Sequence, residues 1–289
     1  MLTVPDGLEV RILGDARQFA ELAGPWLSRD PFSTTGIGVQ LDGVISGSIP
    51  AGPDDIWVAV LERKRVVGAA MHPPPRHLFL PRLSPGVPSQ VALWLAGTGR
   101  SIPGVFGAAM AAREFVETWI ERMGGSSSLR MRQRMYRLER VTAPAATSGY
   151  ACPAGADERD LVVEWFEGFH AEATPYRTSE GLAATVERRI AAAELWLWWD
   201  SGRPVSVAGH HPPAAGVARV GPVYTPPAHR RHGYATAVTA SATEAALGMG
   251  ARHVVLYTDL ANPTANSIYQ ALGFMPDHDA EEWSLMPAS

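Results

Sequence analysis

The stretch from Val220 to Ala235, VGPVYTPPAHRRHGYA, combines residue types that favour binding of an anion. It predicts an apolar strand ending at Tyr224–Thr225, a Pro-Pro turn, a basic loop and then a helix. The free N–H groups and the dipole of a helix start both attract negative charge. Gly233 permits a close backbone approach or a positive φ there. We therefore expect a phosphate-like ligand, the alternative being a solvated basic loop that caps a helix.

A second stretch, Asp259–Phe274, predicts a short helix with an unusual polar face. Asn262 is a favourable N-cap, the helix is expected from Pro263 to Leu272, and Gly273 fits its C-terminal cap. The spacing i, i+3, i+4 places polar side chains on one face. The residues of that face are Asn262, Asn266 and Tyr269. Two amides and a phenol favour a ligand contact, the alternative being a capping Asn and a packed Tyr.

Together, in this order and spacing, the two stretches resemble the GNAT superfamily of N-acetyltransferases. The run Arg230–Ala235 matches the superfamily's pyrophosphate-binding signature, [QR]-x-x-G-x-[GA], and Asn262–Phe274 matches its second cofactor motif. The resemblance is specific over Leu195–Trp283 and weaker over Asp157–Glu172, which corresponds to the helix on the acceptor side. It implies that the chain binds acetyl-CoA as cosubstrate.

The resemblance also implies how each group acts. The strand before the loop splays from its neighbour, the pantetheine arm enters that opening, and strand-end main chain polarises the acetyl carbonyl. Loop amides hold the pyrophosphate. Tyr269 lies near the sulfur and donates a hydrogen bond or a proton to the leaving thiolate, since a phenol with a pKa near 10 is uncharged at neutral pH. The implied cofactor-binding residues are Val223, Tyr224, Thr225, Arg230, Arg231, His232, Gly233, Tyr234, Ala235, Thr236, Asn262, Asn266 and Tyr269.

The general base is left open by the sequence. An amine with a Lys-like pKa of about 10.4 is mostly protonated at pH 7, so some group must remove a proton directly or through water. Besides Tyr269, the candidate catalytic residues are Glu172 and Glu167 on the acceptor-side helix and His210 at a strand end. Further candidates are His170, His211 and Asp259. Each is also explained as a surface or structural group, and a water chain serves equally well.

Two segments of the chain resemble each other. Ile56–Pro74 and Leu195–Pro213 align without a gap, so that Trp57 falls on Trp196 and His72 on His211. Each predicts a strand, a turn and a second strand, with a first strand apolar enough to be covered on both faces. We expect an α+β fold of two tandem GNAT-like domains, each a mixed, mostly antiparallel sheet flanked by helices. The expected ranges are residues 1–142 and 148–289, joined by a Pro-rich linker at residues 141–150.

The first half departs from the cofactor pattern. At the place taken as equivalent, Ile102–Arg113 reads IPGVFGAAMAAR, without the basic loop or the Asn-Pro helix. We expect this half to have lost its cofactor site, to pack against the second half and to help wall the acceptor pocket. Trp26–Gly52 is predicted as loop. Further predicted elements are helices at 108–122, 157–172 and 235–247 and strands at 134–141 and 252–258.

Bulk composition limits the function classes. The 289 residues are 46% hydrophobic and 19% charged, as in a folded protein. A formal net charge of −4 gives no support for nucleic-acid binding. A single cysteine, Cys152, excludes an intrachain disulfide and makes a poor nucleophile in the predicted linker. No run approaches the about 20 apolar residues of a membrane span. We expect a cytoplasmic protein without metal, membrane or nucleic-acid partner, either monomeric or homodimeric.

The sequence thus predicts an N-acetyltransferase whose second half transfers the acetyl group of acetyl-CoA directly to a primary amine of a small-molecule acceptor, without a covalent enzyme intermediate. The main alternative is an acyl-CoA-binding sensor without transfer activity, which would need Gly233 and Asn262 but not Tyr269. A structural protein that binds no cofactor is the second alternative. The presence of Tyr269 favours the enzyme.

Overall fold

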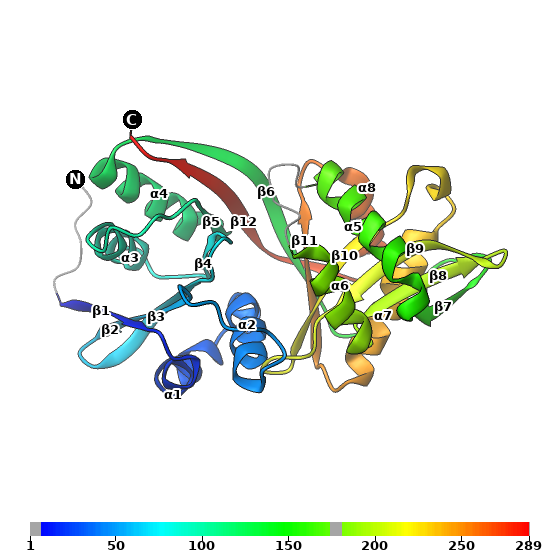
Figure 1. Ribbon diagram of the computed structural model, residues 1–289, viewed down its shortest axis with the longest axis horizontal. Helices are drawn as coiled ribbons and strands as arrows, with labels where there is room; N and C mark the ends of the chain where they lie inside the picture. Colours follow the sequence, from blue (N-terminus) through cyan, green and yellow to red (C-terminus); the bar gives the residue numbers. More distant parts are fainter. Residues whose placement is uncertain (1–6, 174–180, 289) are drawn as a thin grey trace. The chain divides into compact units, whose positions relative to one another are not determined.

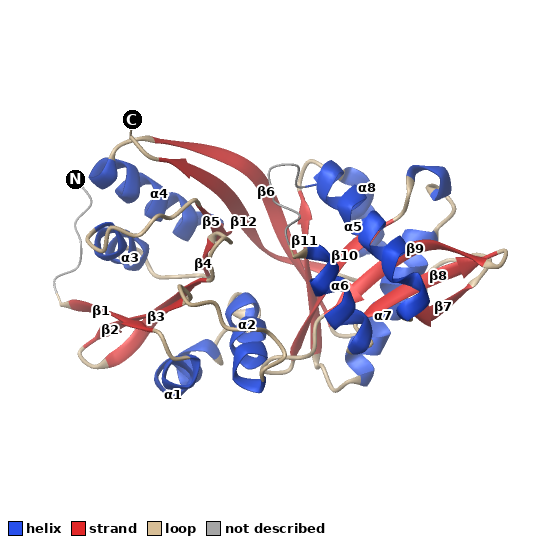
Figure 2. Cartoon of the chain, in the orientation of Figure 1, coloured by secondary structure: helices blue, strands red, loops and turns tan. Residues whose placement is uncertain are grey.

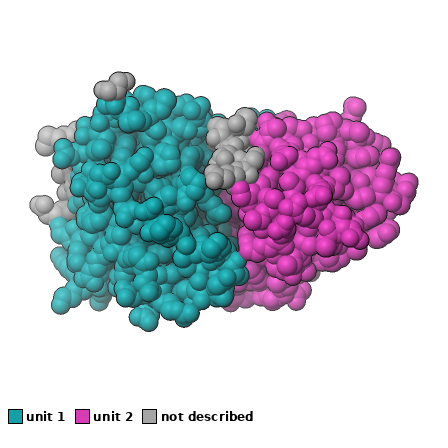
Figure 3. All heavy atoms as spheres, viewed as in Figure 1, with its two compact units in different colours: residues 1–135, 259–261, 277–289 teal, residues 136–258, 262–276 magenta. Residues whose placement is uncertain are grey.

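The computed structural model describes residues 7–173 and 181–288. The chain forms two compact units, coloured separately in Figure 3. Unit 1 consists of residues 1–135, 259–261 and 277–289, and unit 2 of residues 136–258 and 262–276. Each unit is a mostly antiparallel sheet with helices packed on it, so the predicted α+β class is confirmed (Figures 1 and 2).

Unit 1 has the strand order β1-β2-β3-β4-β5-β12, in which only β4 and β5 run parallel to each other among the paired strands of this series. Its strands are β1 (Leu8–Leu13), β2 (Ile56–Glu62), β3 (Arg65–His72), β4 (Leu78–Leu80), β5 (Gly104–Ala108), most of β6 (Ser126–Leu138) and most of β12 (Met275–Met286). Its helices are α1 (Ala16–Leu27), α2 (Thr35–Ser46), α3 (Val87–Ala96) and α4 (Ala109–Met123).

Strand β2 explains how this unit packs. Six of its seven residues are buried, in agreement with the prediction of a strand covered on both faces. Alternate residues point to opposite faces of a strand. Ile56 and Val58 therefore join the core formed with α3 and α4, whereas Trp57 and Ala59 join the core formed with α1 and α2.

Unit 2 has the strand order β11-β10-β9-β8-β7, with the end of β6 beside β11. Its strands are β7 (Tyr150–Pro153), β8 (Leu195–Asp200), β9 (Arg203–His210), β10 (Val217–Tyr224) and β11 (His253–Asp259). Its α-helices are α5 (Arg159–Ala173), α6 (Leu182–Ala191), α7 (Tyr234–Gly248) and α8 (Pro263–Ala271), with 3-10 turns at Ala156–Glu158 and Pro227–His229. Leu195 and Leu197 pack against α5 and α6, while Trp196 and Trp198 face α7.

Two strands, β6 and β12, are each divided between the two units. Strand β6 follows α4 of unit 1, yet its residues Tyr136 and Leu138 are buried in the core of unit 2. Strand β12 follows α8 of unit 2, yet it pairs with β5 and places Leu285 in the core of unit 1. The compact units therefore differ from the predicted ranges 1–142 and 148–289, because Asp277–Ser289 belongs to unit 1.

The two halves repeat the same hairpin, but not at the offset that the sequence alignment indicates. The gapless alignment pairs residues 139 apart. In the structure, adding 138 to the β2–β3 pairs from Trp57 to Glu62 reproduces the β8–β9 pairing, including the position at which its register shifts. The remaining pair, Ile56 with His72, corresponds to the hydrogen bond from His210 N to Glu194 O. At the turns, the pair Glu62–Arg65 corresponds to Asp200–Arg203. The register shifts after Val60 in the first hairpin and after Trp198 in the second.

This offset corrects two of the aligned pairs. A slip of one residue turns every side chain to the other face of a strand. Trp57 faces α1 and α2, whereas Trp196 faces the opposite side, so their alignment is a coincidence. His72 corresponds to His210 rather than His211, and both are buried at the end of the second hairpin strand.

Other local predictions have mixed outcomes. The predicted helices at 108–122, 157–172 and 235–247 are found as α4, α5 and α7, and the strand at 252–258 as β11. The prediction of a loop over Trp26–Gly52 is wrong, because the apolar residues Ile37 and Leu41 of α2 pack on the sheet despite the helix's glycines. Cys152 lies in β7 rather than in the linker, and it is a free, half-buried thiol.

Candidate functional site

Strands β10 and β11 separate after a short parallel pairing. Their register joins residues 217–219 of β10 to residues 253–255 of β11. Both strands then continue, to Tyr224 and to Asp259, without a further pair between them among the described residues (Figure 1). On its other side, β10 stays paired with β9 up to Tyr224. The predicted opening beside the end of β10 is therefore present in the strand pairing.

The loop after β10 leads into helix α7 through a left-handed turn. Arg231 has φ +67°, and Gly233, the residue before α7, has φ +83°. Within the described residues, no protein acceptor binds the backbone N–H groups from Arg231 to Thr236. The next amide, that of Ala237, donates to Gly233 O at 3.0 Å. Six consecutive donors thus remain available at the start of a 15-residue helix, as an anion site requires.

Side chains of the loop mostly have structural partners. Arg230 forms an ion pair with Glu172 of α5, with 2.7 Å from Nη2 to each carboxylate oxygen, and its Nε donates to Thr225 O at 2.9 Å. The buried Tyr234 donates its hydroxyl to Asp200 at 3.0 Å, and His232 stacks on its ring. The loop would therefore bind an anion through main-chain N–H groups and not through the side chains of Arg230, His232 and Tyr234.

The end of β10 is also held from β9 and α5. Ser206 of β9 is fully buried and donates to Tyr224 O at 3.0 Å, and it shares a hydrogen bond of 2.7 Å with the Thr225 hydroxyl. The Tyr224 ring lies against Gly168 of α5, where a Cβ would be 2.7 Å from its hydroxyl oxygen. These contacts fix the main chain of Tyr224 and Thr225 at the edge of the opening, directly after Val223.

Helix α8 has the predicted caps. Asn262 accepts at 2.9 Å from Ala265 N, and Gly273 after the helix has φ +94°. Asn266 is held within the protein, because it accepts from the buried Tyr136 hydroxyl at 2.9 Å and donates to Asn262 O at 2.7 Å. Of the two amides, Asn262 alone has a side-chain NH2 group without a hydrogen bond in the described part of the chain.

Tyr269 is half-buried on α8 and packs at the edge of the core formed by α7, α8, β10 and β11. Its ring meets the Phe274 ring edge-on, with 6.1 Å between centroids. Burial raises the pKa of Tyr269 to about 12. Its hydroxyl has no hydrogen-bond partner within the described residues. The phenol is thus a neutral donor that is free to bind a ligand.

The candidate bases differ widely in surroundings. Glu167 is exposed on α5, and Glu172 is held by Arg230. His210 is 1% exposed, and desolvation lowers its pKa, so its imidazole is neutral at pH 7. Its Nδ1 lacks a partner among the described residues. Burial also lowers the pKa of His211 well below its ordinary value. Asp259 accepts from Ala261 N at 2.8 Å.

Unit 1 contains the counterpart of this loop, at a place that the sequence comparison missed. Element order equates β4, its loop and α3 with β10, its loop and α7, so the counterpart lies at residues 81–87 and not at Ile102–Arg113. Gly86, at the start of α3, has φ +89° and therefore holds the place of Gly233. All three residues of β4 pair with β5, so these two strands do not separate as β10 and β11 do.

In unit 1 a carboxylate of the protein occupies the helix start. Glu114 of α4 accepts from Gly86 N at 2.8 Å, from Ser89 N at 3.2 Å and from Ser89 Oγ at 2.7 Å through one oxygen. Val87 N donates to Ser84 O, the next residue is a proline, and Gln90 N donates to Gly86 O. Every donor at the start of α3 therefore has a protein acceptor, in contrast to α7.

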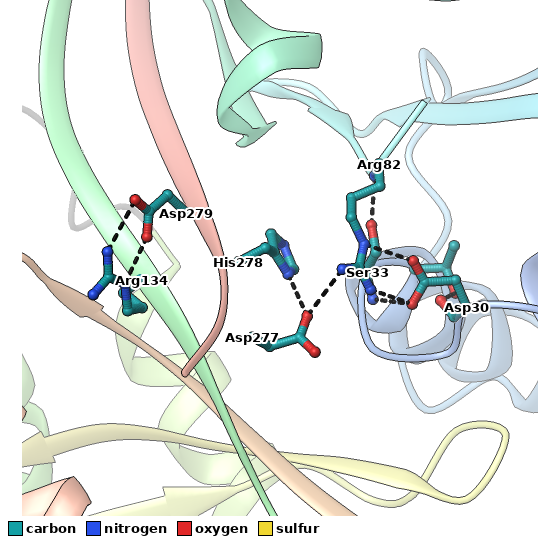
Figure 4. Close-up of polar contacts among 8 residues, drawn as sticks. Asp30, Ser33, Arg82, Arg134, Asp277, His278 and Asp279 are labelled. Atoms are coloured by element: carbon teal, nitrogen blue, oxygen red, sulfur yellow. Dashed lines mark hydrogen bonds and ion pairs between the residues drawn. The ribbon is translucent and has the colours of Figure 1, made fainter. Parts of the chain in front are cut away.

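The basic residue of this loop is also neutralised (Figure 4). Arg82 binds Asp30 through Nε at 2.8 Å and Nη2 at 2.9 Å, and its Nη1 lies 3.4 Å from Asp277 of β12. The amide of Arg82 donates to Ser33 Oγ. Asp277 in turn contacts His278 at 2.7 Å. Two aspartates thus hold the arginine that a phosphate would otherwise meet.

The described residues contain no group of three or more His, Cys, Asp or Glu side chains arranged to hold a metal ion. No helix among them is long and apolar enough to cross a membrane.

Comparison with known proteins agrees with the geometry of unit 2. Residues 159–274 match the model of the acetyltransferase (GNAT) family. The sequence has no significant match among curated proteins. The fold resembles that of a GCN5-related N-acetyltransferase from Sphaerobacter thermophilus, with TM-score 0.64 and 15% identity over 99% of this chain and 98% of that chain.

Two further solved structures span most of the chain. A GCN5-related N-acetyltransferase from Kribbella flavida has TM-score 0.56 and 20% identity, over 89% of this chain and 96% of that chain. A tandem GNAT protein from the clavulanic acid biosynthesis pathway, solved without AcCoA, has TM-score 0.54 and 15% identity, over 98% of this chain and 100% of that chain. At these identities the likeness concerns the fold, and residues 159–274 carry the domain of the acetyltransferase (GNAT) family.

Proposed function

We propose that unit 2 transfers the acetyl group of acetyl-CoA directly to a primary amine of a small-molecule acceptor. The family of residues 159–274 uses an acyl-CoA as cosubstrate, which accounts for the donor class. The observation that carries the proposal is the contrast between two helix starts. The amides from Arg231 to Thr236 lack protein acceptors within the described residues, whereas those of α3 are satisfied by Glu114 and neighbouring carbonyls.

The proposed chemistry places the pyrophosphate at the start of α7 and the pantetheine arm in the opening between β10 and β11. The acceptor nitrogen attacks the thioester carbonyl carbon, a C–N bond forms and the C–S bond breaks. Main-chain donors at the end of β10 stabilise the charge that develops on the carbonyl oxygen. The proton of the attacking amine goes to a base or to water.

Tyr269 would assist departure of the thiolate. An ordinary thiol has a pKa of about 8.5, so complete proton transfer from a phenol with a pKa of about 12 is unfavourable by roughly three to four pKa units. Tyr269 therefore serves better as a hydrogen-bond donor to the sulfur than as a proton source. The thiolate would leave as the anion or take its proton from water.

The base is better sought in bound water than in any one candidate carboxylate. Glu172 is occupied by Arg230 and the Tyr224 hydroxyl, and Glu167 is exposed without a contact that would orient it among the described residues. His210 is neutral at pH 7, as a base must be, but His72 occupies the same place in unit 1 and is equally buried. The fold alone therefore explains the burial of His210, without a catalytic role.

We propose further that one acetyl-CoA binds per chain, in unit 2. The corresponding helix start of unit 1 already holds the Glu114 carboxylate, and β4 remains paired with β5. A phosphate at α3 would have to displace Glu114 and would then lie beside its negative charge. Unit 1 thus retains the domain fold without the cofactor site.

Calorimetric titration with acetyl-CoA tests both points. We expect one site per chain in the wild type and no binding in Gly233→Glu. Thiol release with a panel of primary amines, with Tyr269→Phe beside the wild type, then tests transfer. Tight binding without acetylation of any amine would favour the acyl-CoA sensor. No binding by the wild type would overturn the proposed function, and two sites per chain would overturn the assignment of unit 1.

A further inference from the structure

A buried ion pair lies beside the irregular part of β10. Arg189 of α6 is 3% exposed, and Glu194, which precedes β8, is 5% exposed. Arg189 Nε lies 3.1 Å from Glu194 Oε2. Burial lowers the pKa of Arg189 to about 10, which still leaves the guanidinium charged at neutral pH. Burying two charges carries a large desolvation cost, which the ion pair alone does not always offset. The other hydrogen bonds of Arg189 therefore matter.

The guanidinium bridges the two strands at the irregularity. Arg189 Nη2 donates to His210 O at 3.0 Å and to Gly221 O at 3.2 Å. His210 is the last residue of β9, and Gly221 lies within β10. One charged group therefore satisfies a carbonyl on each strand, and bonds to a charged donor are stronger than those between neutral groups.

The irregularity itself is a β-bulge. Val220 pairs with His210, but Val223 pairs with Ala208, so two residues of β10 lie opposite one residue of β9. The single residue opposite the bulge is Gly209. A Cβ on Gly209 would collide with the guanidinium of Arg189, so the glycine leaves the space that the arginine needs.

The bulge decides where the rest of β10 points. One extra residue reverses which face and which edge each later residue presents. Val223 and Tyr224 follow the bulge directly and border the opening between β10 and β11. If the carbonyls of His210 and Gly221 were released, the bulge would be free to relax, and the main chain of Val223 would lose its direction.

We propose that Arg189 is a positioning residue for the acyl donor: by holding the carbonyls of His210 and Gly221 it fixes the β10 bulge and directs the main chain of Val223 toward the pantetheine arm. This inference rests on the proposed function of unit 2. It separates the donor site into two parts, because the amides at the start of α7 do not depend on Arg189. Loss of Arg189 should weaken binding of the pantetheine arm and leave binding of the diphosphate unchanged.

Titration of wild type and Arg189→Met with acetyl-CoA and with 3′-phospho-ADP, which is CoA without its pantetheine arm, tests this separation. We expect the wild type to bind acetyl-CoA more tightly than 3′-phospho-ADP. In Arg189→Met the ratio of the two affinities should fall about tenfold, the equivalent of one charge-assisted hydrogen bond. Affinity for 3′-phospho-ADP should stay within about twofold. Arg188→Met is the matched control, because Arg188 is the neighbouring arginine on α6 and makes no hydrogen bond to either carbonyl in the described part of the chain.

Arg189→Lys keeps the charge opposite Glu194 but lacks the planar fork that reaches two carbonyls, so it should lose part of the same preference. It decides the question if Arg189→Met does not fold, as judged by circular dichroism. An unchanged preference in a folded variant would overturn the positioning role alone. An equal loss of affinity for both ligands would also overturn it, because it would indicate a general structural effect. Failure of the wild type to bind either ligand would overturn this inference together with the proposed function.

Discussion

Glu172 on α5 holds Arg230 of the basic loop through both carboxylate oxygens, each 2.7 Å from Nη2. The sequence suggested separate roles for them, a base and a cofactor ligand. Their contact instead makes them one unit that ties the loop to the helix on the acceptor side. Arg230 also donates to Thr225 O, so the ion pair fixes the end of β10 relative to α5.

Glu172→Gln distinguishes an anchor from a base. The two side chains are 42% and 48% exposed, so the pair contributes at most about 1 kcal/mol to stability. We expect acetyl-CoA affinity to fall by about two- to fivefold and turnover to follow it, since a loosened loop weakens binding. A general base would cost about 100-fold or more in turnover at saturating donor. Kinetics beside Glu164→Gln, an exposed residue of the same helix, decide between these results.

Gly233→Ala should reduce both stability and acetyl-CoA binding. A Cβ there would come no closer than 3.6 Å to Thr147, so the cost arises from φ +83° and amounts to about 1–2 kcal/mol. Gly86→Ala, at φ +89°, should lower stability similarly and leave acetyl-CoA affinity unchanged. Chemical denaturation and calorimetry on the two variants measure this. Equal loss of binding in both would contradict the assignment of the donor site to unit 2.

Tyr269→Phe should lower turnover by about 100-fold with little change in stability at pH 7, because the hydroxyl has no hydrogen-bond partner among the described residues. The folded-state pKa of about 12 lies above the ordinary value of about 10. The neutral phenol therefore favours folding below pH 10, and that contribution is lost as the pH rises toward 12. Tyr269→Phe should unfold less readily than wild type in this alkaline range. Tyr150→Phe, an exposed tyrosine, is the control, and an unchanged turnover in Tyr269→Phe would remove Tyr269 from the mechanism.

Local signals explain what the sequence could predict of the site. Gly233 before α7, the Asn262 cap and Gly273 after α8 act through their own backbone, so their consequences can be foreseen from a few neighbouring residues. The same holds for β10, which ends at Tyr224 as expected. These features set the position of the loop and of the short helix, and with them most of the proposed donor site.

Contacts between distant residues explain what the sequence could not predict. Arg189 and Gly221 are 32 positions apart, and Glu114 reaches Gly86 across 28. The true offset of 138 is as gapless as the offset of 139 that the shared Trp and His-Pro-Pro residues favoured, so only the strand pairing shows that Trp57 and Trp196 are not equivalent. One available signal was overlooked: Gly168 in the middle of α5, where a glycine is unfavourable unless another group, here Tyr224, needs the space.

His72 should make unit 1 sensitive to acid. It is 2% exposed, and its pKa is lowered to about 4, chiefly by burial. The charges of Arg100 and His77 contribute to this lowering, and the backbone at Arg76 offsets part of it. The neutral ring therefore favours folding above its ordinary pKa of about 6.5, and up to about 3 kcal/mol is lost as the pH falls from 6.5 to 4. His72→Leu should lose less stability over this range in urea unfolding. The exposed His232→Leu is the control, and a variant as acid-sensitive as wild type would contradict the prediction.

Glu114→Ala should turn the start of α3 into an anion site. The change leaves Gly86 N, Ser89 N and the buried Ser89 hydroxyl without their acceptor and should cost about 1–3 kcal/mol. Phosphate can replace the missing carboxylate, because it is also an anion whose oxygens accept hydrogen bonds from the same donors. The melting temperature of the variant should therefore rise more with added phosphate, at constant ionic strength, than that of wild type.

Glu117→Ala is the matched control, since Glu117 is exposed on the same helix and makes no bond to α3 within the described residues. Phosphate bound by unit 2 should stabilise the wild type, Glu114→Ala and Glu117→Ala equally, so its effect cancels when their melting temperatures are compared. If phosphate stabilises Glu114→Ala no more than Glu117→Ala, the carboxylate is not standing in for an anionic ligand. The proposed lack of a cofactor site in unit 1 would then depend on the pairing of β4 with β5 and on the two aspartates that hold Arg82.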